Sequence, residues 1–189
     1  MNLRGLIAGA ILGLAGGCAH QGAIESNELL DERIGISVAA LHEPIEFVQD
    51  EGLTAGKRTS FAYLGPVEWD RMGDIRYGLW IHVAPGNDKP VADIHGNSAV
   101  RILLEDGPWE LKTLPDPPKL GREPYQLQVT WGQAAYFQLD ADALKRLATN
   151  RILSLDFLGT DGSVVHFTTA LDTRASLSEY ARARHVTAD

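Results

Sequence analysis

Hydrophobic residues alternate with polar or small residues along most of the chain after residue 33, and a period of two is typical of half-buried β-strands. Turn residues interrupt the alternation, for example at Gly65-Pro66, Pro85-Gly86 and Asp106-Gly107-Pro108. Strands and turns that recur about every ten residues predict an antiparallel β-sandwich, and a barrel of the same strands stays open as an alternative. The expected strands lie at 34–38, 61–64, 77–83, 100–104, 109–113, 127–131, 136–139, 153–157 and 165–171.

Two short segments have the period of a helix instead. Asp140 is expected to cap the first, which ends near Asn150 and covers one open end of the β-layers. The second opens with a capping-box pattern at Ser176–Glu179. Helical spacing places one stripe on each helix: Ala141, Leu144, Leu147 and Ala148 on the first, and Leu177, Tyr180, Ala181 and Arg184 on the second.

Two connections have a distinctive turn chemistry. Gly159–Ser163 is expected to close the clearest hairpin, because its Asp-Gly pair suits the positive φ angles of a tight turn. Leu114–Arg122 contains prolines at 115, 117 and 118, which cannot donate to a strand ladder. The second connection is therefore expected to be a surface loop rather than a central strand.

The first residues have the three parts of an export signal: a short cationic start, Met1–Arg4, an apolar run, Leu6–Leu14, and small residues at Gly16 and Gly17. Crossing the hydrocarbon core of a bilayer takes about 20 apolar residues, more than lie between Arg4 and Cys18. The segment therefore predicts export rather than a membrane span.

Residues 1–18 resemble the signal peptides of bacterial lipoproteins, whose lipobox ends in a small residue followed by Cys. Ala15 stands where Leu is usual in that family, and Leu14 is one place early. The resemblance implies that the sulfur of Cys18 carries a diacylglyceryl group and that the new amino terminus is acylated. An ordinary secretory signal, with Cys18 incidental, is the alternative.

The location follows from the same resemblance. Two or three fatty chains hold a protein on a membrane almost permanently, so the partner implied at Cys18 is the lipid bilayer. Ala19, rather than Asp, follows the cysteine, which in Gram-negative members of the family is similar to the default for outer-membrane anchoring. The expected location is thus the periplasmic side of the outer membrane, if the host is Gram-negative.

The chain divides into three expected parts: a signal peptide at 1–17, a lipidated Cys and polar tether at 18–32, and one β-domain at 33–189. The formal charge of −8 argues against binding to nucleic acid. Cys18 is the single cysteine, so neither a disulfide nor a cysteine-based metal site is expected. No cofactor motif is present, and no cofactor is expected.

Catalytic candidates are sparse. Asp93 and His95 lie on one side of an extended segment, one expected strand after His82, an arrangement that would suit a metal or acid–base site. Such side chains beside a Gly-rich bend more often form turn hydrogen bonds, so we expect no metal site. Acidic residues that would have to pair for glycoside cleavage are Glu105, Asp106, Glu110 and Asp116, and their separation is not given by the sequence.

Aromatic residues support a binding hypothesis. Trp69, Trp109 and Tyr125 flank turns that contain Gly or Pro, where aromatic rings stack on sugars or anchor a protein partner. A β-domain also needs large aromatic side chains to fill its core, and we expect most of these residues there. The candidate binding residues are Trp109, Pro117 and Tyr125, with Trp109 and the Pro115–Pro118 loop the more exposed.

Two classes of function remain. The first is a non-catalytic envelope lipoprotein that binds a protein or an envelope glycan, and we expect this one rather than an enzyme. The second is a tethered hydrolase of an envelope polymer that uses carboxylates or the Asp93–His95 pair. A water-accessible cleft that unites His82, Asp93 and His95 would favour the hydrolase.

Overall fold

The computed structural model of the chain describes residues 27–49, 59–86, 94, 99–127 and 131–186. None of the helices within these residues is long and apolar enough to cross a membrane. The elements in chain order are β1 (Asn27–Asp31), β2 (Ile36–Ala40), β3 (Ile45–Gln49), β4 (Phe61–Arg71), β5 (Asp74–Ala84), β6 (Ala99–Leu104), β7 (Gly107–Leu111), β8 (Gln133–Leu139), α1 (Ala141–Thr149), β9 (Ile152–Leu158), β10 (Val164–Thr168) and α2 (Arg174–Ala183).

All these strands belong to one antiparallel sheet, so the predicted antiparallel β class with two helices is confirmed. Within the described residues the strands do not separate into the two sheets of a sandwich. Hydrogen-bonded neighbours run β8-β5-β4-β3-β10-β9-β6-β7, and the chain after β7 then pairs with β8 at Thr113 and Phe137. Two backbone bonds seal this junction, from Leu114 N–H to Tyr136 O at 2.8 Å and from Gln138 N–H to Lys112 O at 2.7 Å.

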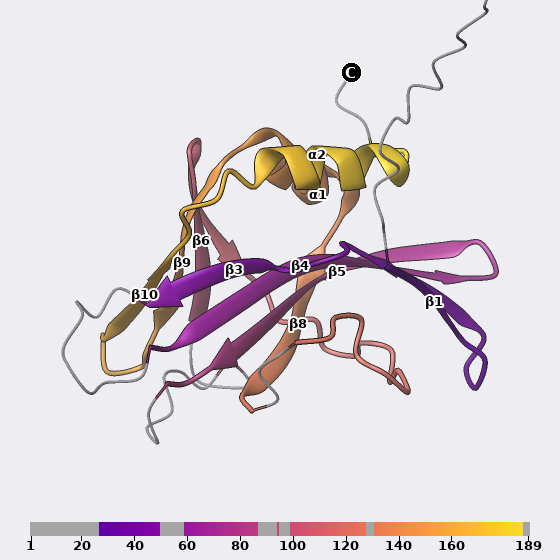
Figure 1. The fold of residues 1–189 in the computed structure, drawn as a ribbon, viewed down its shortest axis with the longest axis horizontal. Coiled ribbons are helices and arrows are strands. Elements are labelled where there is room, and N and C mark those ends of the chain that lie inside the picture. Colours follow the sequence, from indigo (N-terminus) through magenta and orange to yellow (C-terminus); the bar gives the residue numbers. More distant parts are fainter. Residues whose placement is uncertain (1–26, 50–58, 87–93, 95–98, 128–130, 187–189) are drawn as a thin grey trace, which may run out of the picture.

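The sheet is therefore a closed cylinder, and Figure 1 shows β6, β9 and β10 turned steeply away from β3, β4 and β5, as strong curvature requires. Closure removes the exposed ladder edges that an open sheet would present. The side chains that fill the interior with essentially no exposed surface include Leu64, Leu79, Ile81, Ile102, Leu155 and Phe167.

β4 and β5 are equally long, at 11 residues each, and β4 passes through Gly65-Pro66, where the sequence predicted a break. One edge of β4 pairs with β5 along its whole length, whereas the other edge pairs with β3 only up to Leu64 and with β2 only from Val67 onward. Pro66 falls in the gap between β3 and β2, where no ladder needs an N–H. The prediction of a break was wrong because a proline is tolerated at such a gap.

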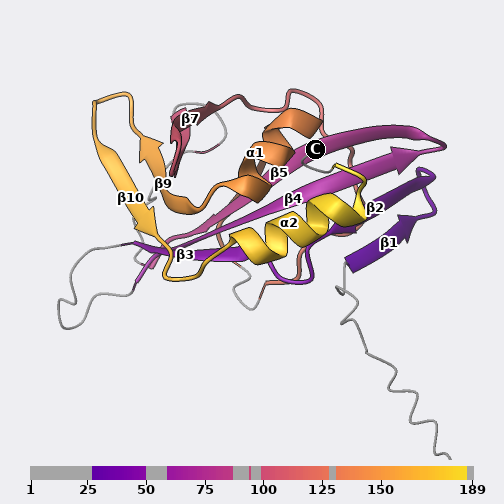
Figure 2. The same ribbon diagram turned by 90° about the horizontal axis from the view of Figure 1, so that it is seen from above.

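Beyond the cylinder, β1, β2 and the distal halves of β4 and β5 form a flat extension, called the wing below. Figures 1 and 2 show the β1–β2 and β4–β5 hairpins projecting to the same side of the molecule. β1 lies within the expected tether at 18–32, and it pairs with β2 along its whole length. Leu29 explains the pairing, because its side chain packs against the core.

The two helices pack together over one end of the sheet (Figures 1 and 2). Asp140 caps α1 as predicted, its side chain accepting the N–H of Ala143 at 2.8 Å. α2 instead begins at Arg174, so the expected capping box at Ser176–Glu179 is wrong. The buried residues agree with the predicted stripes except at Ala141, which is exposed; they include Leu144, Leu147, Leu177 and Tyr180.

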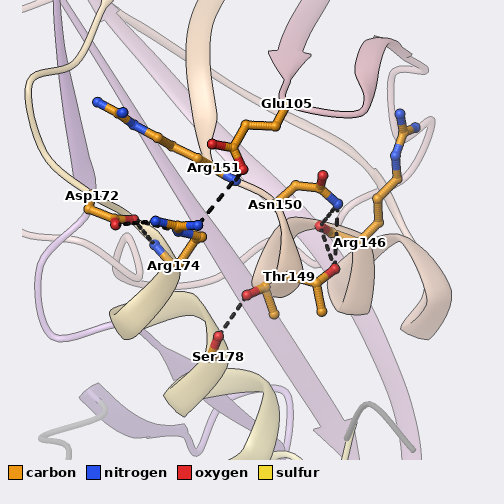
Figure 3. Close-up of polar contacts among 9 residues, drawn as sticks. Glu105, Arg146, Thr149, Asn150, Arg151, Asp172, Arg174 and Ser178 are labelled. Carbon is orange, nitrogen blue, oxygen red and sulfur yellow. Dashed lines mark hydrogen bonds and ion pairs between the residues drawn. The ribbon is translucent and has the colours of Figure 1, made fainter.

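A different hydroxyl of this segment, that of Ser178, joins the two helices. Ser178 Oγ donates to the carbonyl of Ala148 in α1 at 2.6 Å (Figure 3). Beside this bond, Arg174 pairs with Asp172 at 2.7 Å and lies 3.8 Å from Glu105, which follows β6. Polar contacts thus join the start of α2 both to α1 and to the rim of the cylinder.

The remaining strand predictions agree in part with the structure. The hairpin β9–β10 is present, with Gly162 at φ 82° in its turn, although β10 ends at Thr168. β3 was not predicted, because Ile45–Gln49 is short and follows a proline. The strand expected at 127–131 lies mostly outside the described residues.

Candidate binding cleft

An aromatic layer covers the outer face of β4, β5 and β8, opposite the interior of the cylinder. Trp80 lies 4.9 Å from Tyr125 and 5.7 Å from His82 between ring centroids, and Trp69 lies 5.4 Å from Tyr136. The segment Leu114–Leu127, called the cover segment below, runs over this layer and shields it from water. Trp80 is therefore a core residue even though it points out of the cylinder.

Side-chain hydrogen bonds fasten the cover segment to the sheet. Glu123 Oε2 accepts from Trp80 Nε1 at 3.1 Å and from the Tyr136 hydroxyl at 3.2 Å. Gly121 N–H donates to Asp31 Oδ2 at 2.6 Å, and this bond is the main cause of the lowered pKa of that carboxyl. Because the anchors lie on β5, β8 and β1, the cover segment is held as a wall rather than as a loose loop.

Tyr125 is the most deeply placed anchor. Its hydroxyl accepts from Leu41 N–H at 3.3 Å and donates to Pro66 O at 2.7 Å, so it occupies the gap between β2 and β3. Its ring lies directly on Gly65, where any side chain would collide with it. Burial strongly raises the pKa of this phenol. At the gap that β4 crosses without a break, the Tyr125 hydroxyl thus supplies hydrogen-bond partners to the backbone of Leu41 and Pro66.

The first part of the cover segment stands away from the wing and leaves a cleft of about 680 Å³. This volume falls in the range of small-molecule sites in proteins, roughly 300–1,000 Å³. Buried apolar side chains form its floor: Ile36, Trp69 and Leu139. Leu114, Pro117 and Pro118 line the cleft from the cover segment.

Charged side chains line the same cleft. Asp74 pairs with Arg76 at 2.9 Å, and Asp140 is engaged as the cap of α1. In the described part of the chain, Arg71, Lys119 and Asp116 have no ion-pair partner. The lining thus combines an apolar floor with two unpaired cations and one unpaired carboxylate, which suits a ligand with an apolar body and polar or anionic groups.

Of the candidate binding residues, the structure brings only Pro117 to the cleft. Tyr125 is 3 % exposed beneath the cover segment, so its ring serves packing. Trp109 lies on β7, half-buried and packed against the core, and it does not line the cleft. Trp69 was considered with the aromatic residues beside turns but was not chosen as a candidate, and it lies on the floor of the cleft. Its ring lies over Gly78 on β5 and needs the space that a glycine leaves there.

The weak metal candidates are not brought together by the described residues. His82 is buried in the aromatic layer, with its ring 6.2 Å from that of Tyr63, and burial lowers its pKa. Its Nδ1 has no hydrogen-bond partner among the described residues, and a neutral imidazole fits these surroundings. Asp93 and His95 lie outside the described residues. Within the ranges that the structure describes, no three His, Cys, Asp or Glu residues are grouped to hold a metal ion.

Comparison with known proteins found no matching family model, no matching curated protein and no matching solved structure.

Proposed function

We propose that the protein is an envelope-anchored lipoprotein, held in the bilayer through acylated Cys18, whose β-domain binds a partner without catalysis. The partner is a segment of an envelope protein or an envelope glycan, and the domain faces the periplasm if the host is Gram-negative. The cleft is the observation that carries this proposal. Its wall is fastened at Glu123, Gly121 and Tyr125, and a preformed wall lowers the entropy cost of binding.

The chemistry of the cleft favours binding over hydrolysis. Glycoside cleavage needs two available carboxyl groups that flank the scissile bond. Asp74 is paired with Arg76 and Asp140 caps a helix, which leaves Asp116 as the one uncommitted carboxylate among the described lining residues. Prolines, a tryptophan and unpaired cations are groups that hold a ligand rather than cleave it.

Site-specific crosslinking from native membranes tests the proposal. A photoreactive residue is placed at Pro117 in the cleft and, as a matched control, at the exposed Val164 on the opposite hairpin. We expect an adduct from 117 but not from 164, and we expect Lys119→Glu to abolish it. Equal adducts at both positions, or an adduct unaffected by Lys119→Glu, would contradict binding in the cleft.

Two controls address the anchor and the alternative class. Cys18→Ser yields a soluble protein, and if it forms the same adduct at the same yield, the tether does not select the partner. Incubating the purified domain with isolated envelope polymer tests the hydrolase hypothesis. Shortened polymer would overturn the non-catalytic assignment.

A further inference from the structure

We propose that the tip of the β4–β5 hairpin is a second membrane contact, in which Met72, with Ile75 and Leu30 beside it, enters the headgroup region of the bilayer. This inference rests on the anchor at Cys18 in the proposed function. It goes beyond that function because it fixes the orientation of the domain on the membrane.

The tip itself is unusual. β4 ends at Arg71 and β5 begins at Asp74, so Met72 and Gly73 form a two-residue turn, with φ angles of 55° and 92°. Turns of this kind favour Asn-Gly or Asp-Gly, and a long side chain at positive φ is uncommon. The Met72 side chain is 100 % exposed, so no packing within the described fold accounts for a methionine there.

Two more apolar side chains lie on the wing beside the tip. The strand register places Leu30, Ser37, Asp70 and Ile75 in one row across β1, β2, β4 and β5, on one face of the sheet. Leu30 is 61 % exposed and Ile75 is 52 % exposed. Both hairpins project to the same side (Figures 1 and 2), so the three apolar side chains gather at one end of the molecule.

The attachment of the chain identifies lipid as the occupant. β1, which carries Leu30, begins at Asn27, and the chain between Cys18 and Asn27 reaches at most about 30 Å. A lipid on Cys18 therefore holds the wing close to the bilayer, because β1 of the wing is the first strand after the anchor. The β9–β10 hairpin has no such direct connection. Exposed apolar groups held this close to a membrane meet it at a high effective concentration.

The charged side chains at the tip are compatible with an apolar contact to a bilayer of neutral lipid. Asp70 accepts the N–H of Gly73 at 2.7 Å, and Asp74 pairs with Arg76 at 2.9 Å. Arg71 is the cation beside Met72, and its long stem allows the guanidinium to remain among the phosphates while the methionine goes deeper. Because three side chains make a weak contact, the tip is expected to engage only when the domain is tethered.

The sequence supplies a reporter and a coupling site. Met72 is the single methionine after the signal peptide, and Cys18 is the single cysteine. The chain from Cys18 onward, which contains every described residue, is coupled through that thiol to maleimide lipid in phosphatidylcholine vesicles. This artificial anchor tests the tip whether or not the natural protein is acylated, so failure of the two proposals is distinguishable.

The readout is the rate at which a membrane-impermeant oxidant converts Met72 to the sulfoxide, followed by mass spectrometry of the 72–76 peptide. We expect at least a threefold slower rate for the coupled protein than for uncoupled protein mixed with the same vesicles. A Val164→Met variant carries the control reporter on an exposed strand position away from the wing, where the valine is 54 % exposed, and we expect no protection there. Equal rates at Met72 overturn the proposal. Equal protection of both methionines also overturns it. So does protection that increases with the density of protein on the vesicle, because a second copy of the protein would then be covering Met72.

Discussion

Replacing Tyr125 by Phe removes one oxygen from the gap between β2 and β3 and leaves the ring in place. Two buried backbone groups then lose a partner: the N–H of Leu41, 3.3 Å from the hydroxyl, and the carbonyl of Pro66, at 2.7 Å. A buried donor or acceptor left without a partner costs about 1–3 kcal/mol. The burial cost of the removed hydroxyl offsets part of this, so we expect the free energy of unfolding to fall by about 2–4 kcal/mol.

Chemical denaturation of the two proteins measures this loss, and hydrogen exchange locates it. The amide of Leu41 is expected to exchange faster in Tyr125→Phe, because its hydrogen bond is absent even in the folded state. Tyr136→Phe is the matched control, since its hydroxyl bonds to Glu123 at the surface, and we expect a loss of less than about 1 kcal/mol. A Tyr125→Phe protein within about 0.5 kcal/mol of the wild type would refute the bridging role of the hydroxyl.

Two further substitutions test the packing of the sheet. The Asp156 carboxylate is buried, and although burial raises its pKa, hydrogen bonds from Arg101 at 2.8 Å and His166 at 2.6 Å lower it overall. Asp156→Asn is expected to lower the free energy of unfolding at pH 7 by about 2 kcal/mol. A carboxyl with a lowered folded pKa contributes its full stabilisation above its unfolded pKa and loses it as the pH falls through the folded pKa. The deficit in acid denaturation curves should therefore shrink as the pH falls below about 4, and a deficit that is constant with pH contradicts this. Gly78→Ala drives a methyl group into the Trp69 ring and is expected to cost about 1–3 kcal/mol in thermal unfolding, whereas an unchanged midpoint would mean that the ring lies elsewhere.

Part of the fold could be predicted from local sequence patterns. The α1 helix was predictable because its cap at Asp140 and its apolar stripe are neighbours in sequence. The β9–β10 hairpin was predictable for the same reason, since its turn lies between the two strands that it joins. The closure of the sheet was not predictable, because it depends on the pairing of Thr113 with Phe137 across the cover segment.

The cleft could not be predicted from the sequence, because its lining residues come from distant parts of the chain. Pro117 was singled out from its place in a proline-rich loop, but its partners on the floor, Trp69 and Ile36, come from strands far away in the sequence. Tyr125 has the same aromatic character as a binding residue, and only the position of Gly65 beneath it makes it a core residue. Alternation along a strand shows which residues share a face, and it does not show which loop covers that face.

The central claim is that the protein is fixed to the envelope by lipid on Cys18. Intact-mass analysis of the natural protein, extracted from cell membranes with detergent, tests it most directly. We expect a chain that begins at Cys18 and carries the added mass of a diacylglyceryl group and a fatty acyl chain. A mass equal to that of the unmodified polypeptide, whether or not the signal is removed, would contradict it.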